Sequence, residues 1–220
     1  MPAPASERLA RETGTRLLEA AGEVFAGRGF RGATIRQICQ RAAANVAAIH
    51  YHFGDKEGLY AAVLKYCADE ALKRYPPTLG LVPQATAEEQ LRAFVRSFLF
   101  RIADKGRPAW HGKLMAREMA EPTRALDGLI DDVFRPLITR LERIVHRLCG
   151  GAADEETVRR CVRSIQGQCL YYYHARPVIQ RMTPRQRFEP ADIEALAEHI
   201  TRFSLGGIRQ LAGKRRRTRR

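Results

Sequence analysis

The sequence predicts an all-α protein, and three observations support that fold class. Apolar residues recur three and four positions apart along most segments, which is the period of an amphipathic helix. Helix-start signals precede several of these stripes, among them Thr34 with Gln37 and Thr86 with Glu89, which fit capping boxes. No segment shows the alternating pattern or the turn pairs that indicate strands. We expect a small N-terminal module of three helices followed by a larger helical bundle.

The N-terminal module begins with a predicted helix over residues 15–28, which Gly27 and Gly29 terminate. A second helix of about two turns follows Thr34, with the apolar residues of one face turned inward. A tight turn at residues 42–44 ends this second helix.

Asn45 is a suitable N-cap for a third short helix, which points Ile49 and Phe53 inward. Its outward residues are Val46, Ala47, His50 and Tyr51. Two short helices joined by a tight turn have the spacing of a helix-turn-helix unit, in which the second helix enters the major groove of DNA. Nucleic acid is therefore the first partner to test.

The rest of the chain reads as further helices. They are expected over residues 55–75, 86–106, 108–120 and 123–149, and Pro136 should kink the last of them or mark its weak point. Asp154 caps another helix, which runs to about Ala175 and which Pro177 ends, and the final helix follows Pro190. The predicted inward stripe of the final helix consists of Ile193, Leu196, Ala197, Ile200, Phe203, Ser204, Gly207 and Leu211.

Composition limits the class of protein. A chain of 220 residues with 45% hydrophobic residues can bury a real core and hold one or two domains. Its five cysteines show no CxxC spacing, the N-terminus lacks the apolar region of a signal peptide, and no apolar run reaches transmembrane length. We expect a protein of the reduced cytoplasm, without a disulfide framework and without a membrane partner.

The net charge of +14 supports nucleic-acid binding less than its size suggests. Residues 1–75 contribute only +3, residues 76–213 contribute +5, and the tail KRRRTRR at 214–220 adds +6. The basic residues between positions 28 and 56 are Arg28, Arg31, Arg36, Arg41 and Lys56, against the single Asp55. The tail is either a disordered arm that adds sequence-independent phosphate contacts or only a solvated chain end.

The sequence contains no GxSxG, GxxxxGK[ST] or HExxH motif, so it lacks the signatures of a nucleophile elbow, a phosphate loop and a helical zinc site. We expect no enzyme, no cofactor and no metal site. The metal signal is weak because His50 and His52 do not share a helix face, and His146 with Cys149 would need ligands from elsewhere.

The N-terminal motif resembles the signature of the TetR/AcrR family of bacterial transcriptional regulators over residues 15–60. The matching residues are Phe25, Gly29, Phe30, Thr34, Ile35, Ile38, Ala42, His52, Phe53, Lys56 and Leu59. The segments AWHGKLMAREMAEP at 109–122, SIQGQCLYYYHARPVI at 164–179 and DIEALAEHITRFSLGG at 192–207 resemble the C-terminal domain of the CecR-type subgroup.

The chain also departs from the family pattern. Ala43 stands where the family usually has the turn glycine, so the turn is expected to be slightly strained if this residue adopts a positive φ. His50 replaces the usual tyrosine of the recognition helix, and residues 46–48 are apolar where many relatives carry Lys, Gly and Thr.

The resemblance and the residue chemistry together predict the DNA contacts. The predicted DNA-binding residues are Thr34, Arg36, Asn45, Val46, Ala47, Ala48, His50, Tyr51, His52 and Lys56. Arg36 is the best candidate for base reading because a guanidinium can donate to guanine O6 and N7 together. His50 and Tyr51 can add a donor or a stacking edge, and the apolar run at 46–48 can meet thymine methyl groups.

The remaining predicted contacts are at or near helix N-termini, where free N–H groups and the helix dipole attract phosphate. These residues are Thr34, Asn45, His52 and Lys56. For Thr34 and Asn45, helix capping without a phosphate contact is an equal alternative.

A small-molecule effector is expected between helices of the bundle. The candidate ligand-binding residues are Trp110, His111, Met115, Glu118, Met119, Gln166, Cys169, Tyr173 and His174. They are polar or polarisable groups at positions that otherwise face the core, and the alternative is that they are ordinary core residues.

The resemblance further implies that the last two helices pair with those of a second copy in a four-helix bundle. Ser204, Gly206 and Gly207 would permit a close approach, although the same stripes could merely close the core of one chain. In a two-fold homodimer the recognition helices would lie about 34–36 Å apart, so the double-stranded DNA operator should be nearly palindromic.

We therefore predict a DNA-binding domain over 1–60, an effector-binding and dimerisation domain over 61–213, and a basic disordered tail at 214–220. The predicted function is a ligand-responsive regulator, most simply a repressor released by its effector, with the helix at 55–75 transmitting the change. The alternative is an architectural DNA-binding protein with no preferred operator and no effector.

Overall fold

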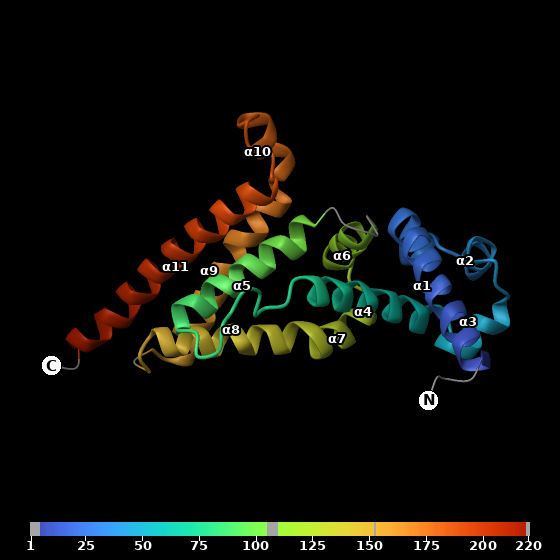
Figure 1. The fold of residues 1–220 in the computed structure, drawn as a ribbon, viewed down its shortest axis with the longest axis horizontal. Coiled ribbons are helices and arrows are strands. Elements are labelled where there is room, and N and C mark those ends of the chain that lie inside the picture. Colours follow the sequence, from blue (N-terminus) through green and yellow to red (C-terminus); the bar gives the residue numbers. More distant parts are fainter. Residues whose placement is uncertain (1–4, 105–109, 152, 219–220) are drawn as a thin grey trace. The chain divides into compact units, whose positions relative to one another are not determined.

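The computed structural model describes residues 5–104, 110–151 and 153–218, and the secondary structure of these residues is helical with no strand (Figure 1). The predicted all-α fold class is therefore confirmed. The chain divides into two compact units, which consist of residues 1–70 with 105–134 and of residues 71–104 with 135–220. We call the first the head unit and the second the body unit.

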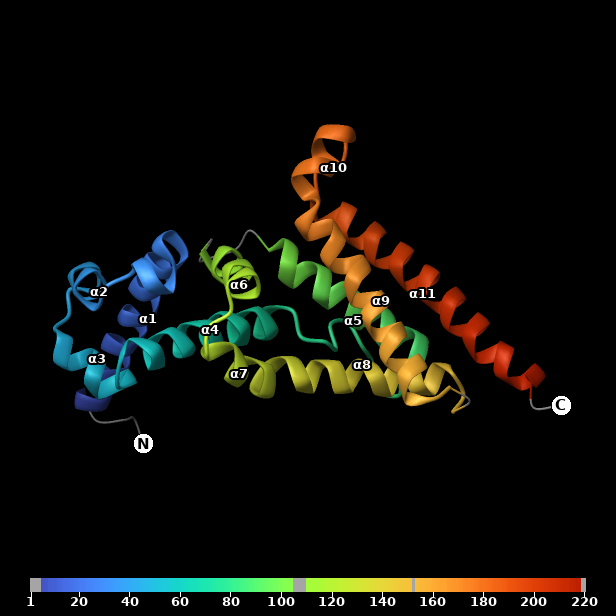
Figure 2. The same cartoon turned by 180° about the vertical axis from the view of Figure 1, so that it is seen from behind.

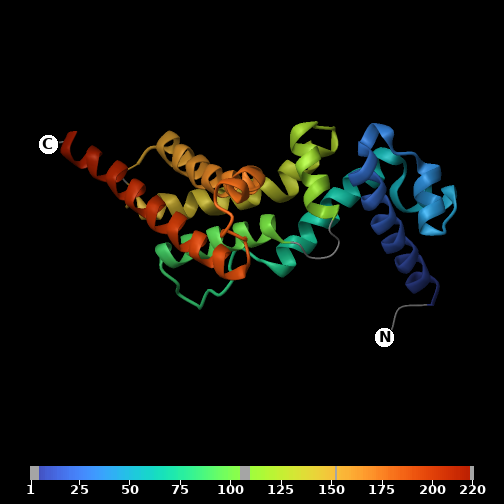
Figure 3. The ribbon, with the colours of Figure 1, turned by 90° about the horizontal axis from the view of Figure 1, so that it is seen from above.

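The head unit contains the predicted three-helix module and a later segment of the chain. Its helices are α1 (Ala5–Gly32), α2 (Ile35–Ala42), α3 (Val46–Phe53), most of α4 (Lys56–Arg74), α6 (Trp110–Ala120), α7 (Ala125–Leu129) and a π-helical turn (Ile130–Phe134). The helix α6 packs against α1 (Figure 3). The compact unit is therefore larger than the predicted domain at 1–60, because residues 105–134 belong to it.

One apolar core unites the head unit. Its completely buried residues are Leu17, Ala21, Phe25, Ile38, Ile49, Leu59, Val63, Leu64 and Leu114. They come from one face each of α1, α2, α3, α4 and α6, so every one of these helices presents an amphipathic stripe to the same interior. At Gly29, where φ is 73°, the first helix is interrupted, as the predicted stop signal indicated.

The body unit is a bundle whose helices are α5 (Ala87–Ala103), α8 (Arg135–Leu148), α9 (Glu155–His174), α10 (Arg176–Met182) and α11 (Pro190–Thr218). The helices α9 and α11 run side by side (Figure 2). The helix α5 is joined to α11 by Arg96, whose Nε donates to both carboxylate oxygens of Glu194 at 2.7 and 2.8 Å. The predicted capping box at Thr86 and the Asp154 cap are both present.

The helix α9 ends at His174, close to the predicted Ala175 and before Pro177. A separate short helix, α10, follows, and Pro177 lies in its first turn, where a missing N–H causes no loss.

One prediction for the last helix is wrong. Phe203 was expected to face the core, but it is 66% exposed, and Leu205 and Ile208 are buried instead. The buried stripe has therefore rotated, so that Gly207 and Leu211 are also exposed.

Pro136 behaves as predicted. The expected helix over 123–149 is interrupted by the π-helical turn at Ile130–Phe134, which ends two residues before Pro136, whose ring nitrogen cannot supply a backbone donor. At the other end of the chain, α11 includes the backbone of residues 214–218, which was expected to be disordered. The side chains of the tail and residues 219–220 lie outside the described residues.

Candidate nucleic-acid interface

The start of α2 is fixed by a reciprocal cap. The Thr34 hydroxyl accepts a hydrogen bond from the Gln37 backbone N–H at 3.3 Å, and the Gln37 side-chain oxygen accepts one from the Thr34 N–H at 3.2 Å. Ile38 and Cys39 are buried beneath the helix, while Arg36 is exposed. The cap and the buried face together fix the direction in which the Arg36 side chain leaves the head unit.

The turn between α2 and α3 depends on Ala43, whose φ of 47° and ψ of 48° are left-handed. The next residue, Ala44, donates its N–H to the Cys39 carbonyl at 3.0 Å and so satisfies the end of α2. The strain that the sequence predicted at this position is therefore present, because an L-residue with a Cβ is disfavoured in this region.

The helix α3 is held to the core by its inner face, and its outer face is exposed. The Asn45 side-chain oxygen accepts a hydrogen bond from the Ala48 N–H at 2.8 Å, which confirms the predicted N-cap. Ile49 is completely buried, whereas Val46 is 45% exposed and Tyr51 is 80% exposed. An outer face of α3 is therefore available to a ligand as large as DNA.

His50 is exposed, but its ring is oriented by the protein. Its Nδ1 lies 2.6 Å from the Gly54 carbonyl oxygen. In the neutral ring this carbonyl requires the proton on Nδ1, which leaves Nε2 as an acceptor.

The first turn of α4 continues the same surface. Asp55 accepts a hydrogen bond from the Gly58 N–H at 2.7 Å, so this helix start is capped as predicted. The Lys56 ammonium lies 4.7 Å above the Phe30 ring. Arg41, counted among the basic residues of this region, forms an ion pair with Glu23, so it has less freedom than Arg36 to reach DNA.

Two of the candidate effector residues are packed inside the head unit. Trp110 is buried with its ring directly against Gly22, where a Cβ would overlap the indole. Glu118 is completely buried and accepts hydrogen bonds from the Tyr60 hydroxyl at 2.8 Å, the Thr123 N–H at 2.8 Å and the Thr123 hydroxyl at 3.0 Å. The Glu118 carboxylate thus joins α4 to the segment after α6.

The other candidates are divided between the core and the surface. In the body unit Cys169 is completely buried, and Tyr173 borders a void of only about 10 Å³, which is close to the volume that one water needs. Met119 and His174 are exposed, and His111, Met115 and Gln166 are half-buried. Neither this void nor the two larger cavities described below gathers these candidates, and their role stays a prediction.

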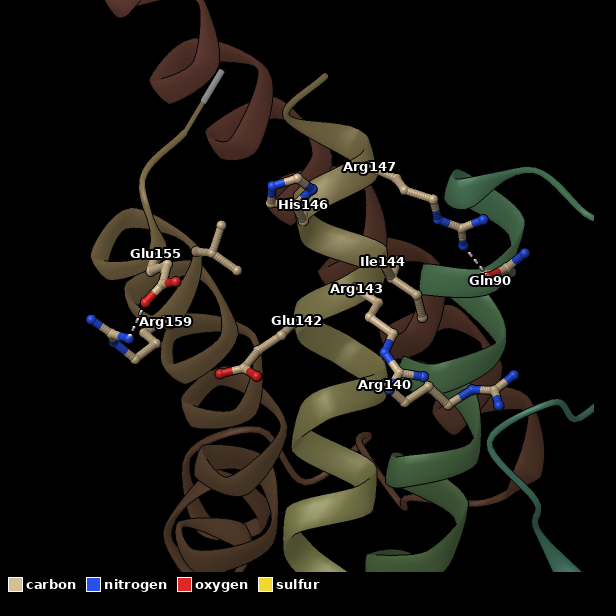
Figure 4. Close-up of a pocket in the computed structure, with 10 residues that line it drawn as sticks. Gln90, Arg140, Glu142, Arg143, Ile144, His146, Arg147, Glu155 and Arg159 are labelled. Atoms are coloured by element: carbon tan, nitrogen blue, oxygen red, sulfur yellow. Dashed lines mark hydrogen bonds and ion pairs between the residues drawn. The ribbon is translucent and has the colours of Figure 1, made fainter. Parts of the chain in front are cut away.

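The sequence interpretation missed a basic groove of about 800 Å³ in the body unit (Figure 4). Arg140, Arg143 and Arg147 line it from α8, and Arg147 donates to the Gln90 side chain of α5. The Nε atom of Arg140 is buried and lacks a hydrogen-bond partner among the described residues. The helical spacing of the three arginines was the available signal.

Thiol and metal chemistry find little support in the described residues. All five cysteines are buried and free, and burial raises the pKa of Cys169 to about 12. A protonated thiol is a poor nucleophile. Within the described ranges, no group of three or more His, Cys, Asp or Glu side chains could hold a metal ion.

The capped helix pair and its exposed second helix define a helix-turn-helix DNA-binding protein. The family description "HTH-type transcriptional dual regulator CecR, C-terminal domain" matches residues 87–208, more than half of the chain, and "Bacterial regulatory proteins, tetR family" matches residues 17–63. The chain belongs to the TetR family of bacterial transcriptional regulators and has a C-terminal domain of the CecR type.

Similar proteins carry related names. The chain is 26% identical over 177 residues to the dual regulator CecR of Shigella flexneri, covering 77% of this chain and 79% of that one. It is 28% identical over 207 residues to the repressor NicS of Pseudomonas putida, covering 88% and 91%.

Solved structures share the fold. AibR in complex with isovaleryl coenzyme A and operator DNA gives a TM-score of 0.63 at 20% identity, covering 86% of this chain and 96% of AibR. The regulator PfmR of Thermus thermophilus gives 0.60 at 17% identity, covering 86% and 94%. In the part of the chain that the structure describes, no helix is long and apolar enough to cross a membrane.

Replacing Ala43 by glycine should stabilise the protein by about 0.5–1 kcal/mol, because the relief of left-handed strain exceeds the added flexibility of the unfolded chain. Denaturant unfolding would measure the change. Ala44→Gly is the matched control, because Ala44 has no positive φ and packs partly against the core; it should be neutral or destabilising. Equal gains from both substitutions would refute the strain.

Replacing Tyr60 by phenylalanine should destabilise the protein by about 1.5–3 kcal/mol, since it removes a hydrogen bond to a buried carboxylate. The same unfolding measurement applies. Tyr51→Phe, at an 80% exposed position, should stay within about 0.5 kcal/mol of the parent protein. If Tyr60→Phe is equally harmless, the Glu118 network does not hold α4 in place.

Proposed function

We propose that the protein is a repressor that binds a near-palindromic operator as a homodimer and is released by a small-molecule effector. The observation that carries the proposal is α3, capped by Asn45 and anchored by Ile49, with its other face exposed. NicS is named a repressor, and the AibR structure contains both operator DNA and a small ligand. These relatives support the same working principle for this chain.

In this proposal Arg36 reads a guanine through the major groove. Its exposure on α2 and its freedom from ion pairs among the described residues favour that role over Arg41, which is held by Glu23. The exposed Tyr51 and His50 read neighbouring edges, with His50 Nε2 as an acceptor. Residues 46–48 provide an apolar surface for thymine methyl groups.

Capping and phosphate binding are compatible at Thr34 and Asn45. Each side chain uses an oxygen to accept the capping hydrogen bond, which leaves the Thr34 hydroxyl hydrogen and the Asn45 amide hydrogens free to donate to phosphate oxygens. Lys56 and His52 add charge and a further donor at the edge of the surface. These contacts set the register of the head on DNA, and the base contacts set the sequence.

The homodimer is proposed to form through α9 and α11. Their outer faces expose Tyr171 by 60% and Phe203 by 66%. Around the outward Cβ positions of Gly167, Gly206 and Gly207 there is open space, so a second pair of helices can approach closely. Exposed aromatic residues beside small ones are a combination that suits a packed interface between helices.

The conformational change that releases the protein from DNA is proposed to be transmitted by α4. This helix starts beside α3 and continues past Glu70 into the body unit. Glu118 binds Tyr60 on this helix, so a movement of α6 would also be felt at α4. The nine candidate effector residues named from the sequence remain predictions within this scheme.

Selection of bound sequences from a random pool of double-stranded DNA, at one stated salt concentration, tests the proposal. A regulator of this kind enriches a near-palindrome with half-sites about one helical turn apart. Enrichment of no sequence would instead support the architectural DNA-binding alternative.

Arg36→Ala should lower affinity for the selected operator by about 10- to 100-fold and leave non-specific binding nearly unchanged, because a bidentate guanine contact discriminates by about 1–3 kcal/mol. Fluorescence anisotropy with specific and scrambled duplexes would measure both affinities. Arg41→Ala is the matched control and should change the two affinities by similar, smaller factors. A uniform loss in Arg36→Ala would contradict base reading.

Phe203→Glu should weaken self-association by on the order of 100-fold, because the dimer would bury the new charge twice. Sedimentation velocity across a concentration series would show the shift to monomer. Met182→Glu changes an 80% exposed side chain on α10 and should leave the association unchanged. An unaltered dimer in Phe203→Glu would exclude this face as the interface.

A further inference from the structure

The head unit contains a cavity of about 790 Å³ that neither the resemblance nor the predicted site residues account for. Three segments line it: residues 28–31 at the end of α1, residues 57–61 at the start of α4, and residues 117–125 at the end of α6 and after it. All three segments belong to the head unit. Its volume lies in the range of sites that hold small organic ligands.

The charge of the lining favours an anion. Arg28, Arg31, Arg117 and Arg124 line the cavity together with only two acidic residues, Glu57 and Glu121. None of these four arginines forms an ion pair with another residue in the described ranges. The guanidinium of Arg117 is held close to Gly29, where a Cβ would lie 3.1 Å from its Cζ. Planar guanidinium groups of this kind bind carboxylates and phosphates in pairs of hydrogen bonds.

The cavity also offers an apolar surface. Phe30 and Tyr60 both line it, and their ring centroids are 5.0 Å apart. A bare inorganic anion would leave this surface without a partner, whereas an anion with a flat apolar body would contact both the rings and the arginines. The lining therefore fits a small organic anion better than a neutral apolar molecule.

The cavity is adjacent to residues that the proposed function assigns to DNA. Phe30 has the Lys56 ammonium 4.7 Å from its ring, and Gly58, which lines the cavity, donates its N–H to the Asp55 cap of α4. Thr123, also in the lining, shares the Glu118 carboxylate with Tyr60. A ligand here would contact the structure that holds the first turn of α4.

We infer that this cavity binds a small organic anion bearing a carboxylate or phosphate, and that its binding lowers the affinity of the protein for DNA. The anion neutralises positive charge within the head unit, and this weakens the attraction to the phosphate backbone. The second half of the inference rests on the proposed function, whereas the binding itself does not.

Isothermal titration calorimetry of the full chain with benzoate and with phenyl phosphate tests the binding, and benzyl alcohol serves as the neutral probe. We expect at least one anion to saturate one site per chain with a Kd on the order of 1 mM, which ligands of about ten non-hydrogen atoms can reach. The alcohol should not saturate. The anion that binds more tightly identifies the preferred head group. Absence of saturation by both anions below about 10 mM, ten times that Kd, would overturn the inference.

Two variants locate the site. Arg124→Gln, at an exposed position, should weaken anion binding about tenfold, the loss expected for one charge-assisted hydrogen bond. Arg143→Gln is the matched control, because it removes an exposed arginine from the basic groove of the body unit. It should leave the Kd for the anion within about twofold, because Arg143 does not line the proposed site. Equal weakening in both variants, or weakening only in Arg143→Gln, would place the anion elsewhere and refute the assignment.

The predicted effect on DNA affinity is tested by measuring operator binding in the presence of the anion that binds. The control measurement replaces this anion by chloride at equal ionic strength. Operator affinity should fall in the parent protein, and the same fall in Arg124→Gln should need about ten times more anion, because this variant binds the anion about tenfold more weakly. Saturable binding without any change in DNA affinity would refute the regulatory half and keep the site. Failure of the protein to select any operator would refute the proposed function. The calorimetry would still decide independently whether the cavity binds the anion.

Discussion

The rest of the head depends on how the short helix α3 is held. A helix of eight residues is unstable alone in water, because nucleation outweighs the few hydrogen bonds that follow. Here Ile49 is the one residue of α3 that is fully buried, and the Asn45 cap satisfies the first turn. Ala48 and Phe53 pack partly against the same core, and the opposite face of α3 stays exposed. The left-handed Ala43 lies between the two short helices and ends α2 directly before the Asn45 cap of α3.

The core beneath α3 extends further along the chain than the helix-turn-helix motif. Leu114 and Trp110 from α6 complete it, and the buried Glu118 ties α4 to the segment after α6. A buried carboxylate is stable only when its oxygens are hydrogen-bonded, and three donors serve Glu118 here. The structural unit that presents α3 is therefore assembled from two separated stretches of sequence, 1–70 and 105–134. Any signal that reaches α6 has a short physical route to α4.

The features that could be predicted from sequence are local ones. The caps at Thr34, Asn45 and Thr86 each join residues three apart, so their chemistry is visible without the fold. Phe203 was misplaced because helical periodicity shows that a stripe exists but does not decide whether a residue at its edge faces the core. Glu118 was ambiguous for another reason. A polar residue on an apolar face can bind a ligand or an internal donor, and only the tertiary position of Tyr60 distinguishes them.

In the proposed complex, two copies of this head read DNA from the major groove, with Arg36 at a guanine. Guanine N7 methylation interference on the selected operator tests it most directly, because N7 lies in the major groove and is the atom that an arginine fork requires. We expect interfering guanines in two symmetric clusters separated by one helical turn, about 10 base pairs. Binding that is indifferent to N7 methylation throughout the site would contradict it.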